Sequence, residues 1–363
     1  MALSIKPRIV VEDDSFLRVI QIVLDPTAAG DLFEAFAHFC AHDLPDFRSW
    51  CERIRASLRH LYTADVRLVR GHDELLANIP GADALVVEAL PVGARELAAA
   101  GANLRIVQRY GSVIRDIDTT ACSSAGVQVK TLRRRANIST AEQALALMLA
   151  LARQLNQNAN LISFEQLETA GYAPTQYDRS RTPNGNWARI TGLKTLFGRQ
   201  LGIIGLGEIG RELALRAAAL GMRIVYHQRH RLIAAEEQHY QVSYSSLLQL
   251  LETSDLISLH LPRTAETRGI IGRSELAIIR PGAMLINVSQ PSLIDRAALL
   301  EALESDRLGG FAMDGFYEEP ARADDPLLKF KNVIITPHLG GSPRFNSLDD
   351  IEELLDNLAK ALS

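Results

Sequence analysis

The amino-acid sequence predicts an α/β fold with parallel sheets, because strand-like and helix-like segments alternate along most of the chain. The alternation restarts at Leu201 with an apolar strand, a glycine-rich turn, an Ala-rich helix and a second strand. Alternation of this kind is typical of parallel sheets joined by helical crossovers. In the first third, the strand-like segments are 6–11, 82–87, 104–108 and 126–129, and the long segment 28–61 has a helical pattern.

The remaining segments carry local signals of their own. Ser139 is a plausible N-cap with Glu142 three residues later, so we predict that a long apolar helix begins there. Residues 156–190 are polar and rich in Gln, Thr, Tyr and Pro, which indicates a connecting excursion between two domains. Residues 348–362 have the pattern of an amphipathic helix. Before that last helix, four segments have the pattern of a strand followed by a loop, with the sequences LISLHLP, MLINVSQ, GGFAMDGF and VIITPHLGG.

Composition and charge narrow the class of protein. The 363 residues are 47% apolar and 23% charged, which is ordinary for a globular chain of about two domains. The net charge of −4 leaves no basic excess for a nucleic-acid backbone, so we expect no nucleic-acid partner. The longest apolar run, 144–152, is shorter than the roughly 20 residues that span a bilayer. Three cysteines at unrelated spacings fit neither a disulfide framework nor a zinc site, and no signal peptide is recognisable, so we expect a cytoplasmic protein without a metal.

A glycine motif predicts a dinucleotide site. Gly205, Gly207 and Gly210 fit the pattern G-x-G-x-x-G after an apolar strand and at the start of a helix, which is the context that makes the pattern specific. The first glycine permits the tight turn, the second lets the backbone approach a pyrophosphate, and the third lets helix and strand pack closely. Free N–H groups at the helix start favour phosphate. We expect the whole segment to bind the cofactor, including Leu206, Glu208 and Ile209.

The end of the next strand bears on the choice of cofactor. An acid that hydrogen-bonds the ribose 2′-OH is expected about 20 residues after the glycines, but the chain has Gln228, Arg229, His230 and Arg231 there. The arginines can bind a 2′-phosphate by charge-assisted bonds, which favours NADP(H) over NAD(H). The alternative is that both arginines are solvated loop charges and that either cofactor binds.

Residues 196–341 resemble the D-isomer-specific 2-hydroxyacid dehydrogenase family. The glycine motif is followed by LHLPRTAET, RPGAMLINVS, LIDRAALLEAL, MDGFYEEP and ITPHLGG, in the order of that family. The resemblance implies two Rossmann-like βαβ domains, with a cofactor domain (136–338) inserted into a flavodoxin-like substrate domain (1–135 and 339–363). It also implies an active site in the cleft between the domains and a homodimer held partly by the helix from Ser139.

The resemblance further implies the site residues. His338 falls on the family's proton donor and Glu319 on its partner carboxylate. A histidine suits proton transfer near neutral pH, and a carboxylate behind it fixes the tautomer and stabilises the imidazolium. Asp314 matches a carboxylate near the nicotinamide amide, although a loop-capping aspartate is an equally good interpretation of the residue alone. The further cofactor-binding residues implied are His260, Leu261, Pro262, Thr267, Val288, Ser289, His338 and Gly340.

The chain departs from the family at both elements that hold a substrate carboxylate. Gln290 stands where the family has an arginine and is followed by Pro291, and Val113 replaces a glycine of the loop after residue 108. The substrate-binding residues expected in that loop are Arg109, Tyr110, Gly111, Ser112 and Arg115. Either another cation takes over, from Arg109, Arg115, Arg344 or the run Arg133, Arg134 and Arg135, or the substrate is not a small 2-oxo acid.

Three functions follow, in order of preference. The first is hydride transfer between a nicotinamide cofactor and a carbonyl or hydroxy substrate, in which Gln290 joins His338 and Glu319 as a catalytic residue. The second is a nicotinamide-assisted elimination or epimerisation without net redox change, which the loss of the arginine makes worth testing. The third is a cofactor-sensing binding protein, against which the intact His338 and Glu319 argue.

Overall fold

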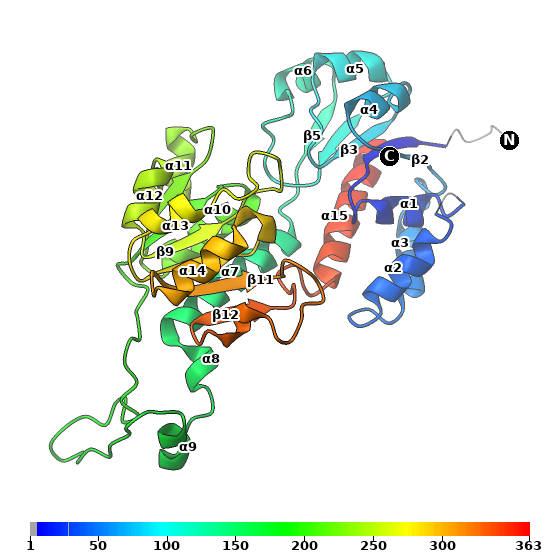
Figure 1. Cartoon of the computed structure of the whole chain (residues 1–363). Coiled ribbons are helices and arrows are strands. Elements are labelled where there is room, and N and C mark those ends of the chain that lie inside the picture. The colour runs from blue at the N-terminus through cyan, green and yellow to red at the C-terminus, as the bar shows by residue number, and fades with distance from the viewer. Residues whose placement is uncertain (1–5, 28) are drawn as a thin grey trace. The chain divides into compact units, whose positions relative to one another are not determined.

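The computed structural model describes residues 6–27 and 29–363, and the chain forms two compact units (Figure 1). Unit 1 consists of residues 1–139 and 341–363, and unit 2 consists of residues 140–340. Each unit is built on one sheet in which every strand pair is parallel. The predicted α/β class with two parallel sheets is therefore confirmed.

Unit 1 has a five-stranded sheet with the order β2-β1-β3-β4-β5. This is the flavodoxin-like order that we expected. The elements are β1 (Arg8–Glu12), α1 (Arg18–Leu24), α2 (Leu32–Cys40), α3 (Phe47–Ser57), β2 (Asp65–Val69), α4 (His72–Asn78), β3 (Ala84–Val87), α5 (Ala94–Ala100), β4 (Ile106–Arg109), α6 (Thr119–Ser124), β5 (Gln128–Lys130) and α15 (Phe345–Leu362).

Both faces of the unit 1 sheet are buried. Ile9 and Val11 of β1 belong to one apolar cluster, and Val10 between them belongs to another. Because successive side chains of a strand point to opposite faces, this division shows that helices cover the sheet on both sides. Helix α15 returns the end of the chain to this unit, and its Leu354 and Leu358 are fully buried in the first cluster.

The helical pattern predicted over 28–61 corresponds to two helices, α2 and α3. Ala28 lies outside the described residues, and α2 ends at Cys40 before α3 begins at Phe47. Pro45 lacks the N–H that a continuous helix needs, and Asp46 caps α3 by accepting the N–H of Ser49 at 2.9 Å. The helical pattern is thus present as two helices, with a break at Pro45.

The predicted long helix is present as α7 (Arg135–Arg153). It begins four residues before Ser139, so the prediction of Ser139 as its N-cap is wrong. Asp350 of α15 accepts the N–H of Arg135 at 3.0 Å and also pairs with the guanidinium of Arg135 at 2.9 Å. A carboxylate more than 200 residues away thus caps the helix, and the Ser139 hydroxyl donates instead to the carbonyl of Ser342. Burial raises the pKa of Asp350 above its ordinary value.

Unit 2 has a seven-stranded sheet with the order β12-β11-β10-β9-β6-β7-β8. Counted from β6, this is the Rossmann order 3-2-1-4-5-6 with one further strand at the edge. The elements are α8 (Leu155–Asn158), α9 (Phe164–Thr169), β6 (Gln200–Ile204), α10 (Glu208–Ala219), β7 (Arg223–His227), α11 (Ala234–Tyr240), β8 (Val242–Tyr244), α12 (Leu247–Thr253), β9 (Leu256–Leu259), α13 (Arg273–Ile278), β10 (Ala283–Asn287), α14 (Arg296–Glu304), β11 (Leu308–Asp314) and β12 (Val333–Thr336), with 3₁₀ turns at Pro291–Leu293 and Pro326–Lys329.

The order of the unit 2 strands reverses at β6, which pairs with β7 on one side and β9 on the other. In open α/β sheets, ligands bind beyond the carboxyl ends of the strands at such a switch point. The segment predicted as a connecting excursion, 156–190, contains part of α8 and all of α9, and it extends away from the sheet of its unit (Figure 1). Among the helices that the structure describes, none is both long and apolar enough to cross a membrane.

Candidate functional site

The glycine turn between β6 and α10 lies at the switch point. Gly205 has φ +93°, and a Cβ there would lie 2.4 Å from the carbonyl oxygen of His260, so only glycine fits. A Cβ on Gly210 would lie 2.5 Å from the carbonyl oxygen of Gly205. Gly207, by contrast, has nothing within 4 Å of its Cβ position. Two glycines thus serve close packing, and the third leaves open space in front of the helix start.

The same turn is tied to the end of β7. Gln228 accepts the N–H of Leu206 through Oε1 at 3.2 Å and donates through Nε2 to the carbonyl of His230 at 2.6 Å. Glu208 and Ile209 begin α10 directly after Gly207. The start of α10 therefore offers N–H groups next to open space, which suits the pyrophosphate of a dinucleotide.

The two arginines after β7 differ in their contacts. Arg231 forms a bidentate pair with Glu237 of α11, at 2.8 Å for both hydrogen bonds, and the hydroxyl of Tyr226 donates to the same carboxylate at 2.8 Å. The guanidinium of Arg231 lowers the pKa of Glu237. Arg229 is exposed and forms no ion pair with any residue in the described ranges 6–27 and 29–363. Glu237, six residues after Arg231, therefore lies near the end of β7, and its carboxylate is already paired with Arg231.

The end of β9 carries a buried histidine. The side chain of His260 lies 2.8 Å from the hydroxyl of Ser258 through Nε2, while its Nδ1 has no hydrogen-bond partner among the described residues. Burial lowers the pKa of His260 to about 3, so its imidazole is neutral at physiological pH. Leu261 and Pro262 follow, and the hydroxyl of Thr267 donates to the carbonyl of Pro262 at 2.6 Å, which fixes the loop.

The end of β10 carries Val288, Ser289 and Gln290. The hydroxyl of Ser289 donates to the carbonyl of Leu259 at 2.9 Å and so ties this loop to the end of β9. Asn287 is fully buried and donates to the carbonyl of Gln290 at 2.9 Å. The backbone of Gln290 is therefore held, and its side chain is exposed.

Asp314, at the end of β11, holds the loop that follows β12. Its Oδ1 accepts the N–H of Leu339 at 2.8 Å and the hydroxyl of Thr336 at 2.5 Å, and its Oδ2 accepts the N–H of Gly340 at 2.6 Å. These are the contacts of a loop-capping aspartate, the alternative that the sequence left open. A role of Asp314 toward a nicotinamide amide stays a prediction.

His338 and Glu319 are brought together as the sequence predicted. Nδ1 of His338 lies 3.1 Å from Oε2 of Glu319, and the other carboxylate oxygen accepts the N–H of Phe316 at 3.1 Å. His338 has φ +59°, a left-handed conformation that residues other than glycine seldom adopt and that is frequent at functional sites. The side chain of His338 is 70% exposed, so its Nε2 edge is available to a substrate.

A cavity of about 340 Å³ joins these strand ends. It is lined by Gln290, Asp314, Glu319 and His338, and its size suits a small molecule. Two arginines from the loop after β9 that the sequence reasoning missed, Arg263 and Arg268, also line it. The signal available in the sequence was the position of Arg263 directly after Pro262, at a strand end already predicted to carry function.

The residues predicted to bind substrate in unit 1 lie at the end of β4. Arg109 is 9% exposed, and its Nε and Nη1 have no hydrogen-bond partner among the described residues. Tyr110 is buried beneath the guanidinium of Arg134, which lies 4.0 Å from the ring centre, and burial raises the pKa of its hydroxyl. Gly111 is buried, whereas Ser112 and Arg115 are exposed.

The other cations considered as substitutes for residue 290 have contacts of their own. Arg344 lies over the ring of Phe39, with 3.6 Å to its centre, and Arg135 pairs with Asp350 and Glu353. Arg133 and Arg134 also have interactions. Among the residues that the structure describes, no group of three or more His, Cys, Asp or Glu side chains could hold a metal ion.

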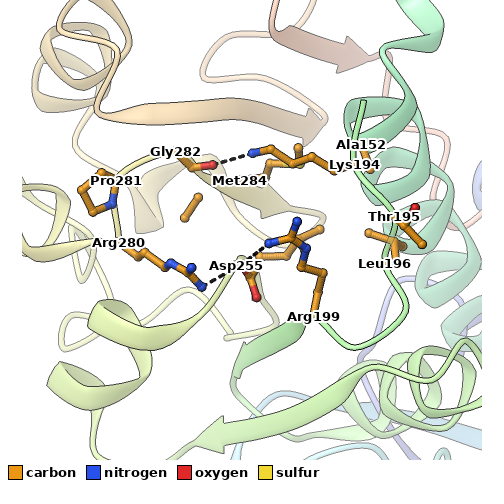
Figure 2. A pocket seen from close by; sticks show the side chains of 12 residues that line it. Ala152, Lys194, Thr195, Leu196, Arg199, Asp255, Arg280, Pro281, Gly282 and Met284 are labelled. Atoms are coloured by element: carbon orange, nitrogen blue, oxygen red, sulfur yellow. Dashed lines mark hydrogen bonds and ion pairs between the residues drawn. The ribbon is translucent and has the colours of Figure 1, made fainter. Parts of the chain in front are cut away.

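A second cavity, of about 140 Å³, lies at the amino ends of the unit 2 strands (Figure 2). Arg199 and Arg280 both donate to Oδ1 of Asp255, at 3.1 and 2.7 Å, and Nζ of Lys194 donates to the carbonyl of Gly282 at 2.8 Å. None of the predicted site residues lines this cavity. Because ligands of open α/β sheets bind at the opposite edge, its contacts serve to fix the strand starts.

The comparisons with known proteins agree with this geometry. Residues 145–340 match the family described as D-isomer specific 2-hydroxyacid dehydrogenase, NAD binding domain. The chain is 33% identical over 305 residues to D-3-phosphoglycerate dehydrogenase of Archaeoglobus fulgidus, covering 82% of this chain and 53% of that protein. It is 34% identical over 270 residues to glyoxylate reductase of Thermococcus litoralis, covering 74% of this chain and 77% of that protein.

A solved structure of a glyoxylate reductase from Paecilomyes thermophila matches with a TM-score of 0.55 and 25% identity, over 99% of this chain and 96% of that one. The chain spans about half the length of the D-3-phosphoglycerate dehydrogenases that it matches.

Proposed function

Because this chain belongs to the D-isomer-specific 2-hydroxyacid dehydrogenase family, we propose that it transfers a hydride between a nicotinamide cofactor and a carbonyl or hydroxy group. The substrate is a 2-hydroxy acid, its oxo form or an atypical relative of one. The observation that carries this proposal is the contact of 3.1 Å between His338 and Glu319, in a cavity at the carboxyl ends of the unit 2 strands.

His338 is the proton donor and acceptor in this proposal. Reduction of a carbonyl leaves negative charge on its oxygen, and an imidazolium can deliver the compensating proton from Nε2 while Nδ1 stays hydrogen-bonded to Glu319. Glu319 orients the ring and stabilises its charged form, and Gln290 offers an N–H donor to the reacting oxygen from the same cavity. The bound nicotinamide supplies or takes up the hydride.

The residues of unit 2 fit a dinucleotide. The open space at Gly207 and the N–H groups of the α10 start suit its pyrophosphate, and the residues after β9 and β10 flank the same switch point. We assign to this role Leu261, Pro262, Thr267, Val288, Ser289, Asp314 and Gly340, together with the glycine turn and the residues from Gln228 to Arg231.

The activity is tested by absorbance at 340 nm with NADPH and NADH against a panel of 2-oxo acids that includes glyoxylate and hydroxypyruvate. Net oxidation of the cofactor, abolished in His338→Gln, supports the proposal. Product formation without net absorbance change would indicate elimination or epimerisation. Tight cofactor binding without any product would indicate a sensor and would overturn the proposed activity.

We propose a preference for NADP(H) that rests on Arg229. Residues 228–231 after β7 include no acid, the nearby Glu237 is paired with Arg231, and Arg229 makes no ion pair within 6–27 and 29–363. A free guanidinium can bind a 2′-phosphate by charge-assisted bonds. Arg229→Gln should therefore raise KM for NADPH at least tenfold and leave KM for NADH nearly unchanged, and Arg231→Gln should have the smaller effect. Equal KM values for NADPH and NADH in the wild type would contradict the preference.

We propose that unit 1 is the substrate domain and that the end of β4 and the loop after it bind the substrate. Arg109 supports this assignment, because a buried guanidinium with two unpartnered nitrogens is costly unless a ligand group satisfies it. Arg109→Gln should raise KM for the substrate without changing the cofactor affinity measured by fluorescence. A substrate KM equal to that of the wild type would exclude this role.

We also propose a homodimer. Large apolar side chains are exposed in α8, in α9 and between them, with Leu155 49%, Ile162 79% and Phe164 42% exposed. Exposed apolar surface of this kind is typical of an interface. Light scattering coupled to gel filtration should give twice the mass of the chain, and Ile162→Asp should shift the population toward monomer.

A further inference from the structure

The cavity around His338 contains positive charge that the sequence reasoning did not place there. Arg263 and Arg268 both line it, and neither side chain forms a hydrogen bond or ion pair with the residues described, 6–27 and 29–363. Both residues are exposed. Two unpartnered guanidiniums therefore share one cavity with His338, the proton donor of the proposed function.

The carboxylates of the cavity are already engaged. Asp314 accepts three hydrogen bonds from the loop after β12 and the end of β12 itself, and Glu319 is bonded to His338 and to the N–H of Phe316. Because neither acid pairs with Arg263 or Arg268, both guanidinium groups are available to bind a ligand. A guanidinium matches carboxylate and phosphate oxygens by two parallel hydrogen bonds.

Position 290, in the same cavity, cannot supply that charge. The side chain of Gln290 has an N–H donor but is neutral, and its backbone is fixed by Asn287. The cations of the loop after β9 thus complement an uncharged donor at the end of β10, and a ligand can use both.

We propose that Arg263 and Arg268 bind the anionic groups of the substrate in place of a cation at residue 290, so that the site selects hydroxy and oxo acids with two anionic groups. This inference rests on the proposed function, since it assigns the substrate class of that cavity. Two guanidiniums can balance two negative charges, whereas a substrate with one carboxylate leaves one cation unpaired. Binding should weaken as ionic strength rises, because the arginines are exposed.

The test compares binding of tartronate, a 2-hydroxy acid with two carboxylates, and lactate, which has a methyl group in place of one of them. Calorimetry is performed with reduced cofactor present, so that a hydroxy acid cannot be turned over. The wild type should bind tartronate at least tenfold more tightly than lactate, which corresponds to about 1.4 kcal/mol. Arg263→Gln and Arg268→Gln should each reduce that ratio at least threefold and leave cofactor affinity unchanged.

Arg223→Gln is the matched control, because Arg223 is an exposed arginine of the same unit at the amino end of β7. It should keep the wild-type ratio. Wild-type tartronate affinity in both cavity variants, or equal affinity of the wild type for tartronate and lactate, would overturn the inference. The calorimetric result does not depend on turnover, so absence of activity at 340 nm would overturn the proposed function while the arginine pair is still tested.

Discussion

Replacing Gly210 and Gly207 separately by alanine should show that Gly210 is needed for packing and Gly207 for cofactor binding. In Gly210→Ala, the new Cβ would lie 2.5 Å from the carbonyl oxygen of Gly205, whereas real Cβ contacts stay above 3.0 Å. The start of α10 must then move by at least 0.5 Å, the difference between these distances. Overpacking of this kind costs about 1–3 kcal/mol, and we take the upper half of that range because the contacted atom is a backbone oxygen that cannot rotate away. Alanine recovers about 1 kcal/mol as the better helix former.

We therefore expect Gly210→Ala to lower the free energy of unfolding by about 1–2 kcal/mol, measured by urea denaturation of the cofactor-free protein. In Gly207→Ala the methyl group meets no atom within 4 Å and φ is −75°, so stability should change by less than about 1 kcal/mol. The methyl group would occupy the space in front of the helix start, so the Kd for NADPH should rise about tenfold or more. A Gly207→Ala protein that binds NADPH normally, or a Gly210→Ala protein of wild-type stability, would refute this reasoning.

Three further outcomes follow from individual contacts. Glu319→Gln should lower kcat for carbonyl reduction about 10- to 100-fold without changing the urea midpoint, because His338 loses the carboxylate that orients it, and an unchanged kcat would contradict that role. His260 has a pKa of about 3 in the folded protein, so below about pH 6.5 the unfolded chain binds a proton that the folded chain does not, and stability falls as pH is lowered, by up to about 1.4 kcal/mol per unit. His260→Gln should flatten that slope in urea titrations between pH 7 and 4.5, and an identical slope would argue against a neutral, buried imidazole. Asp350→Ala should cost about 2–4 kcal/mol, because it uncaps α7 and leaves Arg135 without this partner, whereas Asp350→Asn, which keeps an acceptor, should cost less; equal losses would contradict the capping role.

Much of the fold could be predicted from local pattern. The β-branched residues of β1 and β4 and the apolar run of β3 identify buried strands, and the glycine turn after β6 identifies the start of the cofactor unit. Strand β2 was not predicted, because its alternation of Val66 and Leu68 with charged residues spans only five positions. A signal that short does not separate a strand from a loop.

The candidate site shows the same division. Each motif lies directly after a strand in the sequence. The sequence by itself therefore determined that the glycine turn precedes the helix α10, and that Glu319 and His338 follow the adjacent strands β11 and β12. Contacts between distant segments were decided only by the tertiary structure. Asp350 caps α7 from 215 residues away, and Arg263 lines the cavity that also contains Gln290. The physical reason is that the energy of a charged side chain depends on the distance to the groups around it in the folded chain, and the local sequence does not specify which groups those are.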